Sequence, residues 1–278
     1  MISYSDLTFI IVTFKSEHII DDCLKDIPEE CKKIIVENSS NNEFYKNLEN
    51  KIPNLKVFVM NGNCGFGKAN NFGILNSDTD YLFLINPDAK IYKSEIDKII
   101  TIIQNVDFAI AAPQIIEKFK IYKQNKENKD YVIVNEVPGI AMILNKKKFS
   151  NNFFDENFFL YLEETDLCKR VKESGEKIIE INAEVSHLGN QSHKHHDSFE
   201  IEKSRNWHWM WSRFYFSKKH KGYTKSIIIF FPILIKLLIK LIFYFLLRNN
   251  TKFVISKKRF DGLLASIVGK GSDYRPKI

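Results

Sequence analysis

The stretch YLFLINPDAKI, residues 81–91, places a proline and a single carboxylate directly after an apolar run. Its first five residues are typical of a buried strand. Pro87 has no backbone N–H and cannot extend a strand ladder, so the strand is expected to stop there. Asp88 therefore follows the end of a buried strand, and the rest of the chain decides what a carboxylate does in that position.

The N-terminal half of the chain alternates apolar runs with segments of helical spacing. This alternation predicts an α/β fold, with a mostly parallel sheet and helices on both faces. In such sheets ligands bind beyond the carboxyl ends of the strands, so Asp88 is expected at a binding site. Strands are predicted at 7–14, 31–40, 54–63, 80–89, 137–144 and 177–189, helices at 16–27, 67–77 and 159–175, and an exposed loop or edge at 117–135.

Composition and charge narrow the class of protein. The 278 residues are 44% hydrophobic and 27% charged, which is a globular composition long enough for a large domain with its own core. The net charge is +7, and the excess of Lys and Arg is concentrated after residue 203. A basic tail argues against a general nucleic-acid face, so we expect no nucleic-acid partner. The four cysteines form no C-x-x-C pair and no secretory signal is evident, which predicts a reduced, cytosolic chain.

The C-terminal region differs from the rest of the chain. Residues 226–247 are apolar except for Lys236 and Lys240, and Pro232 interrupts the run. Two central lysines argue against a spanning helix, and together with Lys225 they fall on one narrow helical face, as in helices that lie in a membrane interface. A helical hairpin packed on the domain is the alternative. We divide the chain into a large α/β domain, 1–222, and a basic, apolar helical region for membrane association, 223–278.

Four polar motifs follow the predicted strands, at the edge where a ligand is expected. They are VTFKS (12–16), VENSSNN (36–42), NGNCGFGKANNFGI (61–74) and INPDA (85–89). Together with FDENFFLYLEETDLCKRVKESG (154–175) and VSHLGNQS (185–192), they resemble family 2 glycosyltransferases of the GT-A fold, in particular the bacterial rhamnosyltransferase-like branch. The resemblance covers about residues 7–193. The order of all six motifs and the 154–175 block make it specific.

The resemblance implies a site for a nucleoside-diphosphate sugar at the first strand ends. A carboxylate suits ribose hydroxyls because it only accepts hydrogen bonds, although Glu37 stands where this family usually has Asp. Backbone amides at a helix start, with a lysine beside them, suit a diphosphate; a plain surface lysine is the alternative for Lys68. The implied donor-binding residues are Thr13, Phe14, Glu37, Asn38, Lys68, Asn70 and Asn71.

The resemblance also gives Asp88 a role as ligand of a divalent metal that binds the donor diphosphate. Relatives often carry two carboxylates here as D-x-D, whereas this chain has Asn86-Pro87-Asp88. Mg²⁺ or Mn²⁺ suits oxygen ligands and a diphosphate. His187 matches a late histidine that completes the metal site in relatives; a structural histidine after a strand is the alternative.

The motif EETD, residues 163–166, supplies the implied catalytic base. Asp166 is the predicted base for the acceptor hydroxyl, and Glu164 stands at the family's first Asp position, which leaves the choice between them open. Adjacent acids repel one another, which raises proton affinity and suits a base. The alternative is a helix N-terminus rich in acids that the helix dipole stabilises.

The implied reaction is an inverting transfer of a sugar, such as rhamnose or another deoxyhexose, to a hydroxyl of a cell-surface glycan or lipid-linked acceptor. The basic, apolar tail would hold the enzyme on an anionic membrane surface, at the cytoplasmic face of the bacterial inner membrane. A membrane-bound nucleotide-sugar-binding protein with a decayed site is the alternative, since one carboxylate of D-x-D is missing. A nucleotidyltransferase ranks lower because VTFKSEHI, residues 12–19, has no glycine.

Two aromatic or histidine-rich motifs have no assigned role. SHKHHD, residues 192–197, has three histidines but no cysteine pair to support a zinc site, and is interpreted as a loop near donor or acceptor. WHWMW, residues 207–211, suits interfacial anchoring, sugar stacking or core packing.

Overall fold

The computed structural model describes residues 1–39, 42–117, 120–122, 124, 129–187 and 198–276. The chain forms two compact units. The first comprises Met1–Asp155 and Glu164–Lys194, and the second comprises Glu156–Glu163 and His195–Ile278. The boundary therefore lies before residue 198 and not at 222/223, because the long helix that precedes residue 222 packs with the C-terminal helices.

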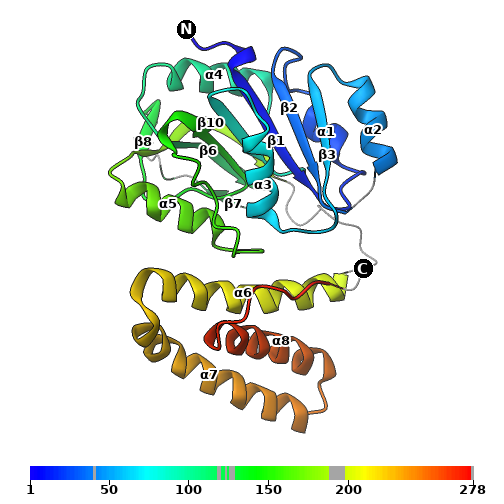
Figure 1. The fold of residues 1–278 in the computed structure, drawn as a ribbon, viewed down its shortest axis with the longest axis vertical. Coiled ribbons are helices and arrows are strands. Elements are labelled where there is room, and N and C mark those ends of the chain that lie inside the picture. Colours follow the sequence, from blue (N-terminus) through cyan, green and yellow to red (C-terminus); the bar gives the residue numbers. More distant parts are fainter. Residues whose placement is uncertain (40–41, 118–119, 123, 125–128, 188–197, 277–278) are drawn as a thin grey trace. The chain divides into compact units, whose positions relative to one another are not determined.

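One sheet organises the first unit (Figure 1). Its described strands follow the order β3-β2-β1-β4-β9-β6-β10-β5, with β7 paired to β6 and β8 paired to β10. The strands are β1 Leu7–Thr13, β2 Lys32–Glu37, β3 Leu55–Val59, β4 Tyr81–Ile85, β5 Ala89–Lys90, β6 Ile110–Glu117, β7 Lys120–Tyr122, β8 Tyr131–Ile133, β9 Ala141–Asn145 and β10 Ile178–His187.

The sheet is parallel in its N-terminal half and mixed beyond it. β3, β2, β1 and β4 run parallel to one another, as predicted from the alternation of strand and helix. β9 lies antiparallel between β4 and β6, and β10 is parallel to β6. Between β6 and β9 the described residues form the short strands β7 and β8, and no helix lies among them. A return without a crossover helix is compatible with the antiparallel pairing of β9. The segment 117–135, predicted as a loop or edge, thus contributes both short strands.

Helices cover both faces of the sheet, as predicted. Successive strand residues point to opposite faces, so Phe9 joins one apolar cluster and Ile10 the other. α1 and α4 pack on the face of Phe9, whereas α3 and α5 pack on the face of Ile10. Strands buried on both faces explain the continuous apolar runs in the sequence. The helices of this unit are α1 Ile20–Leu24, α2 Asn42–Lys51, α3 Phe66–Leu75, α4 Lys93–Ile103 and α5 Glu163–Glu173.

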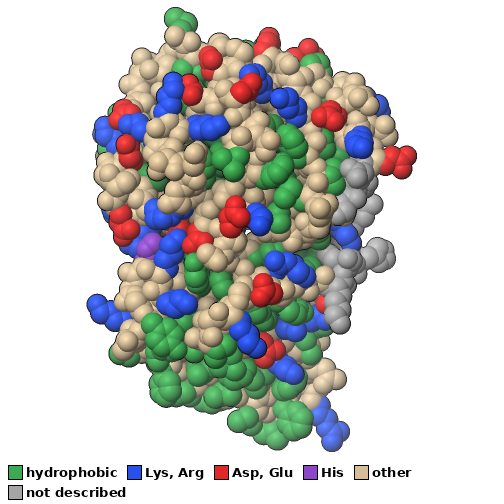
Figure 2. Space-filling view, in the orientation of Figure 1, with side chains coloured by type: hydrophobic (Ala, Val, Ile, Leu, Met, Phe, Trp, Pro, Cys, Tyr) green, Lys and Arg blue, Asp and Glu red, His purple; other side chains and the backbone are tan. Residues whose placement is uncertain are grey.

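Three helices form most of the second unit: α6 Ser198–Lys221, α7 Tyr223–Leu246 and α8 Asn250–Ile267. Their apolar centre includes Phe214, Phe230 and Leu263. Much of α7 is not covered by the other two helices, and hydrophobic side chains gather over it on the surface (Figure 2). Among the described residues, α7 is the one helix that is long and apolar enough, by length and composition alone, to cross a membrane.

Candidate functional site

The ends of β1 and β2 are joined through buried polar side chains. Thr13 and Glu37 are partners in the parallel register, and the Thr13 hydroxyl donates a hydrogen bond to the Glu37 carboxylate. The Ser39 amide and hydroxyl donate to its other oxygen. Burial raises the pKa of Glu37, and these hydrogen bonds oppose that rise. Glu37 was predicted to accept hydrogen bonds from ribose hydroxyls. Both of its carboxylate oxygens instead accept hydrogen bonds from Thr13 and Ser39 of the same chain. Phe14, which follows Thr13, is half-buried at the same strand end.

Asn38 ties the same edge to the start of α3. Its backbone N–H donates to the Thr13 carbonyl at 2.9 Å, and its side-chain Nδ2 donates to the Gly65 carbonyl at 3.3 Å. Gly65 precedes α3 with φ +91°, a conformation that favours glycine. Lys68 is exposed in the first turn of α3, next to the helix N-terminus that attracts anions.

The two asparagines of α3 are buried and bonded to backbone groups. Asn70 Nδ2 donates to the Phe66 carbonyl at 3.0 Å. Asn71 donates to the Phe154 carbonyl at 2.8 Å and accepts from the Phe154 amide at 2.9 Å, which fixes the chain before α5 onto α3. These bonds suit a structural role better than the predicted contact with the nucleotide-sugar.

Asp88 and His187 meet at the carboxyl ends of β4 and β10. Asp88 is 3% exposed, and its Oδ1 lies 3.4 Å from Nε2 of His187. The β5–β10 ladder explains this approach, because His187 is paired with Ala89, the neighbour of Asp88. The predicted pair is therefore in contact, although its residues are 99 positions apart in the sequence.

A second carboxylate, Glu117, lies on the other side of the His187 ring. Its Oε1 is 2.9 Å from Nδ1 of His187. The neighbouring carboxylates, Asp88 first and then Glu117, raise the pKa of His187, while burial lowers it. The sequence analysis did not single out Glu117. No local sequence signal marks Glu117, because its place beside His187 depends on the register of β6 against β10.

The Asp88–His187 pair fits a divalent cation. Two adjacent ligands of an octahedral Mg²⁺, each at 2.0–2.1 Å, lie about 3 Å apart, close to the 3.4 Å observed between Oδ1 and Nε2. Among the described residues, no three His, Cys, Asp or Glu side chains are grouped so as to hold a metal on their own. Asp88 and His187 would therefore supply one oxygen and one nitrogen to such an ion.

Glu164 lies at the same edge of the sheet, in the first turn of α5. A Cβ built on Gly139 would be 3.4 Å from Cβ and Cγ of Glu164, so the two residues are in contact. Gly139 precedes β9, whose first residue is paired with Ile85, the last residue of β4. Burial raises the pKa of Glu164, and the charge of Glu136 adds to that rise. Glu164 also lines a cavity of about 440 Å³ together with Glu136, Val137 and other residues.

Asp166 has a different environment. Its side chain is 0% exposed, and its Oδ2 lies 2.8 Å from Nε of Arg170, one turn along α5. Arg170 also donates to the carbonyls of Asn152 and Phe153. The pair therefore holds the chain before α5, and a carboxylate enclosed in this way is poorly placed to reach an acceptor hydroxyl. This geometry argues against the predicted role of Asp166 as base.

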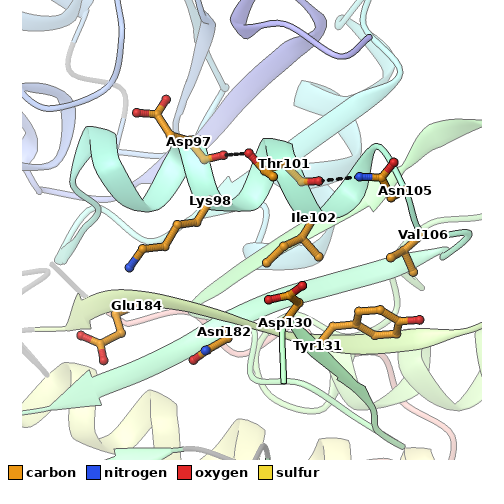
Figure 3. A pocket seen from close by; sticks show the side chains of 10 residues that line it. All are labelled: Asp97, Lys98, Thr101, Ile102, Asn105, Val106, Asp130, Tyr131, Asn182 and Glu184. Atoms are coloured by element: carbon orange, nitrogen blue, oxygen red, sulfur yellow. Dashed lines mark hydrogen bonds between the residues drawn. The ribbon is translucent and has the colours of Figure 1, made fainter. Parts of the chain in front are cut away.

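The larger cavity of about 710 Å³ lies elsewhere in the first unit (Figure 3). Asp97, Lys98 and Thr101 of α4 line it, as do Asn182 and Glu184 of β10. None of the predicted site residues lines this cavity, so volume alone does not locate the site.

The motif WHWMW lies in the second unit, and its tryptophans differ in environment. Trp207 and Trp211 are buried; the Trp211 indole donates to the Lys270 carbonyl at 2.9 Å. Trp209 is 38% exposed and packs edge-on against Tyr161. Core packing therefore accounts for two of the three. The histidine motif 192–197 lies outside the described residues.

Comparison with protein families decides the classification. The model of glycosyl transferase family 2 matches residues 8–167, more than half of the chain. The chain belongs to glycosyl transferase family 2. The family-level resemblance of the motifs is thereby confirmed, whereas the rhamnosyltransferase-like branch stays a prediction.

A curated relative agrees with this membership. The low-salt glycan biosynthesis hexosyltransferase Agl10 of Haloferax volcanii is 25% identical over 191 residues, which are 60% of this chain and 62% of the relative. The match thus spans less than two thirds of that relative.

Solved structures share the fold at low sequence identity. A mannosyltransferase of Pyrobaculum calidifontis in complex with GDP-Man and Mn²⁺ has a TM-score of 0.58 at 9% identity, covering 94% of this chain and 87% of its own. S. aureus TarS 1–349 in complex with UDP-GlcNAc has a TM-score of 0.54 at 13% identity, and the match covers 95% of this chain and 92% of the TarS chain. These likenesses confirm the predicted GT-A-like fold.

Proposed function

We propose that this protein transfers a hexosyl or deoxyhexosyl group from a nucleoside-diphosphate donor to a hydroxyl of a glycan or lipid-linked acceptor. The observation that carries the proposal is the pairing of Asp88 with His187 at the carboxyl ends of β4 and β10, where α/β enzymes bind ligands. Family membership supports it, as does the printed description of Agl10 as a hexosyltransferase.

The donor would bind along the ends of β1 and β2 and at the start of α3. Thr13, Phe14, Glu37 and Asn38 shape the edge for the nucleoside, and the exposed Lys68 faces the diphosphate from the first turn of α3. Asp88 and His187 would hold Mg²⁺ or Mn²⁺. A bound divalent ion neutralises charge that develops on the departing diphosphate. The complexes of structural neighbours with Mn²⁺ support this choice of ion.

We assign the base to Glu164 in place of Asp166. Glu164 is only partly buried at this edge of the sheet, and a raised pKa makes its carboxylate a stronger base. In the proposed step the acceptor oxygen forms a bond to the anomeric carbon while the bond from that carbon to the diphosphate oxygen breaks. The acceptor proton passes to Glu164. A single displacement of this kind inverts the anomeric centre.

Membrane association is the second part of the proposal, and α7 carries it. At roughly 100° per residue, Lys225, Lys236 and Lys240 fall within an arc of about 60°, beside the face on which Phe230 and Leu237 pack against the other helices. The remaining arc is apolar and solvent-exposed. Its main residues are Ile228, Phe231, Ile235, Leu238, Ile239, Ile242, Phe245 and Leu246. Such a helix can lie in an anionic interface with its lysines toward the headgroups, on the cytoplasmic leaflet where the donor is available.

A donor screen tests the proposal. The full chain is incubated with Mg²⁺ or Mn²⁺ and a panel of UDP-, GDP- and dTDP-sugars, and released nucleoside diphosphate is measured. Metal-dependent release from one donor supports a transferase and names the sugar. A thermal shift with one donor but no release calls for the same assay with lipid-linked acceptors. Silence in both assays would instead support a nucleotide-sugar-binding protein without turnover.

A further inference from the structure

His187 is held between two carboxylates by the pairing of three strands. In the β6–β10 ladder His187 is paired with Glu117, and in the β5–β10 ladder it is paired with Ala89. The imidazole therefore has Glu117 on one side and Asp88 on the other. The side chains of His187 and Glu117 are 11% and 28% exposed, so solvent reaches this arrangement only in part.

The two ring nitrogens of His187 face different partners. Nδ1 is 2.9 Å from Glu117 Oε1, a normal hydrogen-bond length, whereas Nε2 is 3.4 Å from Asp88 Oδ1, which is long for a hydrogen bond. A carboxylate can only accept, so the contact with Glu117 requires a proton on Nδ1. In the neutral ring, that tautomer leaves the lone pair on Nε2, the nitrogen that faces Asp88.

We propose that Glu117 is a positioning residue for the metal site. It fixes the ring orientation and the Nδ1–H tautomer of His187, so that Nε2 and the Asp88 carboxylate are presented together to a divalent cation. Histidine ligands of metals commonly donate their other N–H to a carboxylate, and loss of that partner costs about 10- to 100-fold in metal affinity. The inference rests on the metal assignment of the proposed function.

A set of variants separates positioning from a plain structural contact. Glu117→Ala removes the acceptor, whereas Glu117→Gln keeps a side-chain oxygen that can accept from Nδ1–H and removes only the charge. His187→Gln identifies the signals of His187 by their loss, and Asp88→Asn weakens the metal site itself. Far-ultraviolet circular dichroism and melting curves show that each variant is folded.

The first readout is the tautomer of His187, measured by long-range ¹H–¹⁵N NMR at a pH at which the ring is neutral. We expect the Nδ1–H form in the wild type and in Glu117→Gln, and a change toward Nε2–H in Glu117→Ala. A purely structural contact would leave the tautomer of the alanine variant unchanged, and that result would overturn the proposal whether or not metal binds.

The second readout is the affinity for Mn²⁺ alone, measured by electron paramagnetic resonance of the free ion. We expect Glu117→Ala to bind Mn²⁺ about 10- to 100-fold more weakly than the wild type, and Glu117→Gln to recover most of the loss. Equal affinity in the wild type and Glu117→Ala, with weaker binding by Asp88→Asn, would refute the role of Glu117 and keep the metal site. Equal binding by the wild type and Asp88→Asn would instead refute the metal assignment, and the tautomer measurement then decides on Glu117.

Discussion

Asp166 and Arg170 form an ion pair within α5, with 2.8 Å between Oδ2 and Nε and no exposure of the Asp166 side chain. Asp166→Asn would leave Arg170 without its anionic partner, although the guanidinium keeps its two backbone acceptors. We expect the free energy of unfolding to fall by about 2 kcal/mol. Denaturant titration followed by circular dichroism measures the change. An unchanged stability together with lost turnover would return the role of base to Asp166.

Glu164→Gln is expected to reduce turnover without lowering stability, the reverse of what we expect for Asp166→Asn. Loss of a general base reduces the rate of sugar transfer by about 10²- to 10⁴-fold. Stability should stay constant or rise, because burial disfavours the charged form of Glu164. The assay uses the donor identified by the screen, with melting curves as a control for folding. Full turnover by this variant would contradict the proposed base.

The pH dependence of transfer follows from the same carboxyl group. A base acts in its deprotonated form, so the rate should fall as the pH drops through the pKa of Glu164. Because that pKa is raised, the fall should begin at a higher pH than for an ordinary glutamate. Glu136→Gln removes a charge that contributes to the rise, and the acidic limb of the rate profile should therefore move to lower pH. A limb that stays in place would show that another group controls it.

The strands β1 to β4 and the polar motifs at their ends were predictable from the sequence, because both depend on local order, whereas β6 Ile110–Glu117 was not predicted. Apolar runs mark β1, β2 and β4, and polar motifs mark the ends of these strands. The place of Glu117 was not predictable in this way, since it depends on the register of β6 against β10, strands some 70 residues apart. The burial of Asp166 also depends on tertiary packing and could not be predicted from local sequence. Its ion pair with Arg170 could have been, because residues at i and i+4 lie side by side on a helix.

Gly262 is required by the close approach of α8 to α6. A Cβ at this position would lie 2.1 Å from the Trp207 carbonyl oxygen, which is backbone and cannot rotate away. Replacing glycine with alanine inside a helix ordinarily raises the stability of the protein. At Gly262 the clash makes the same replacement destabilising. We expect Gly262→Ala to lower the stability of the second unit by about 3 kcal/mol.

Tryptophan fluorescence measures this effect in the second unit alone, because all three tryptophans of the chain lie in α6. Lys257→Ala, at an exposed position of α8, serves as the matched control and should leave the unfolding midpoint nearly unchanged. Equal midpoints for Gly262→Ala and Lys257→Ala would show that the two helices do not approach as closely as described.

His208 makes the same unit sensitive to acid. The side chain is fully buried, and its Nε2 is 2.7 Å from the Tyr274 carbonyl. Burial lowers the pKa of His208 to about 4, and the charge of Arg275 adds to this effect. The unfolded chain therefore binds a proton between its ordinary pKa of about 6.5 and pH 4 that the folded unit does not bind. Stability is kept above this window and is lost as the pH falls through it.

The expected loss from His208 is about 2 kcal/mol between pH 7 and pH 5. Urea titrations at the two pH values, followed by tryptophan fluorescence, measure it. His208→Gln cannot be protonated, so the difference between pH 7 and pH 5 should shrink by about this amount relative to the wild type. A variant with the same pH dependence as the wild type would assign the effect to other groups.

The exposed apolar face of α7 predicts binding to anionic membranes. Ile239 and Ile242 are 60% and 62% exposed on this face, and replacing both with glutamate puts charge where the acyl chains would lie. Ile133 is 66% exposed on β8 of the first unit and gives a matched substitution outside α7. We expect the double variant to lose about 1,000-fold in affinity for phosphatidylglycerol vesicles, because burial of each isoleucine contributes about 2 kcal/mol and every 1.4 kcal/mol is about tenfold. Ile133→Glu should bind as the wild type does.

The lysine face of α7 adds a dependence on charge and salt. Wild-type binding, followed by co-sedimentation, should weaken when phosphatidylcholine replaces phosphatidylglycerol and when the salt concentration rises, since screening reduces attraction between exposed charges. Replacing Lys225, Lys236 and Lys240 with glutamine should remove most of this difference between lipids while the apolar contribution stays. If the isoleucine variant sediments with vesicles as strongly as Ile133→Glu does, the exposed face of α7 has another partner, and the measurement then to make is the oligomeric state of the full chain.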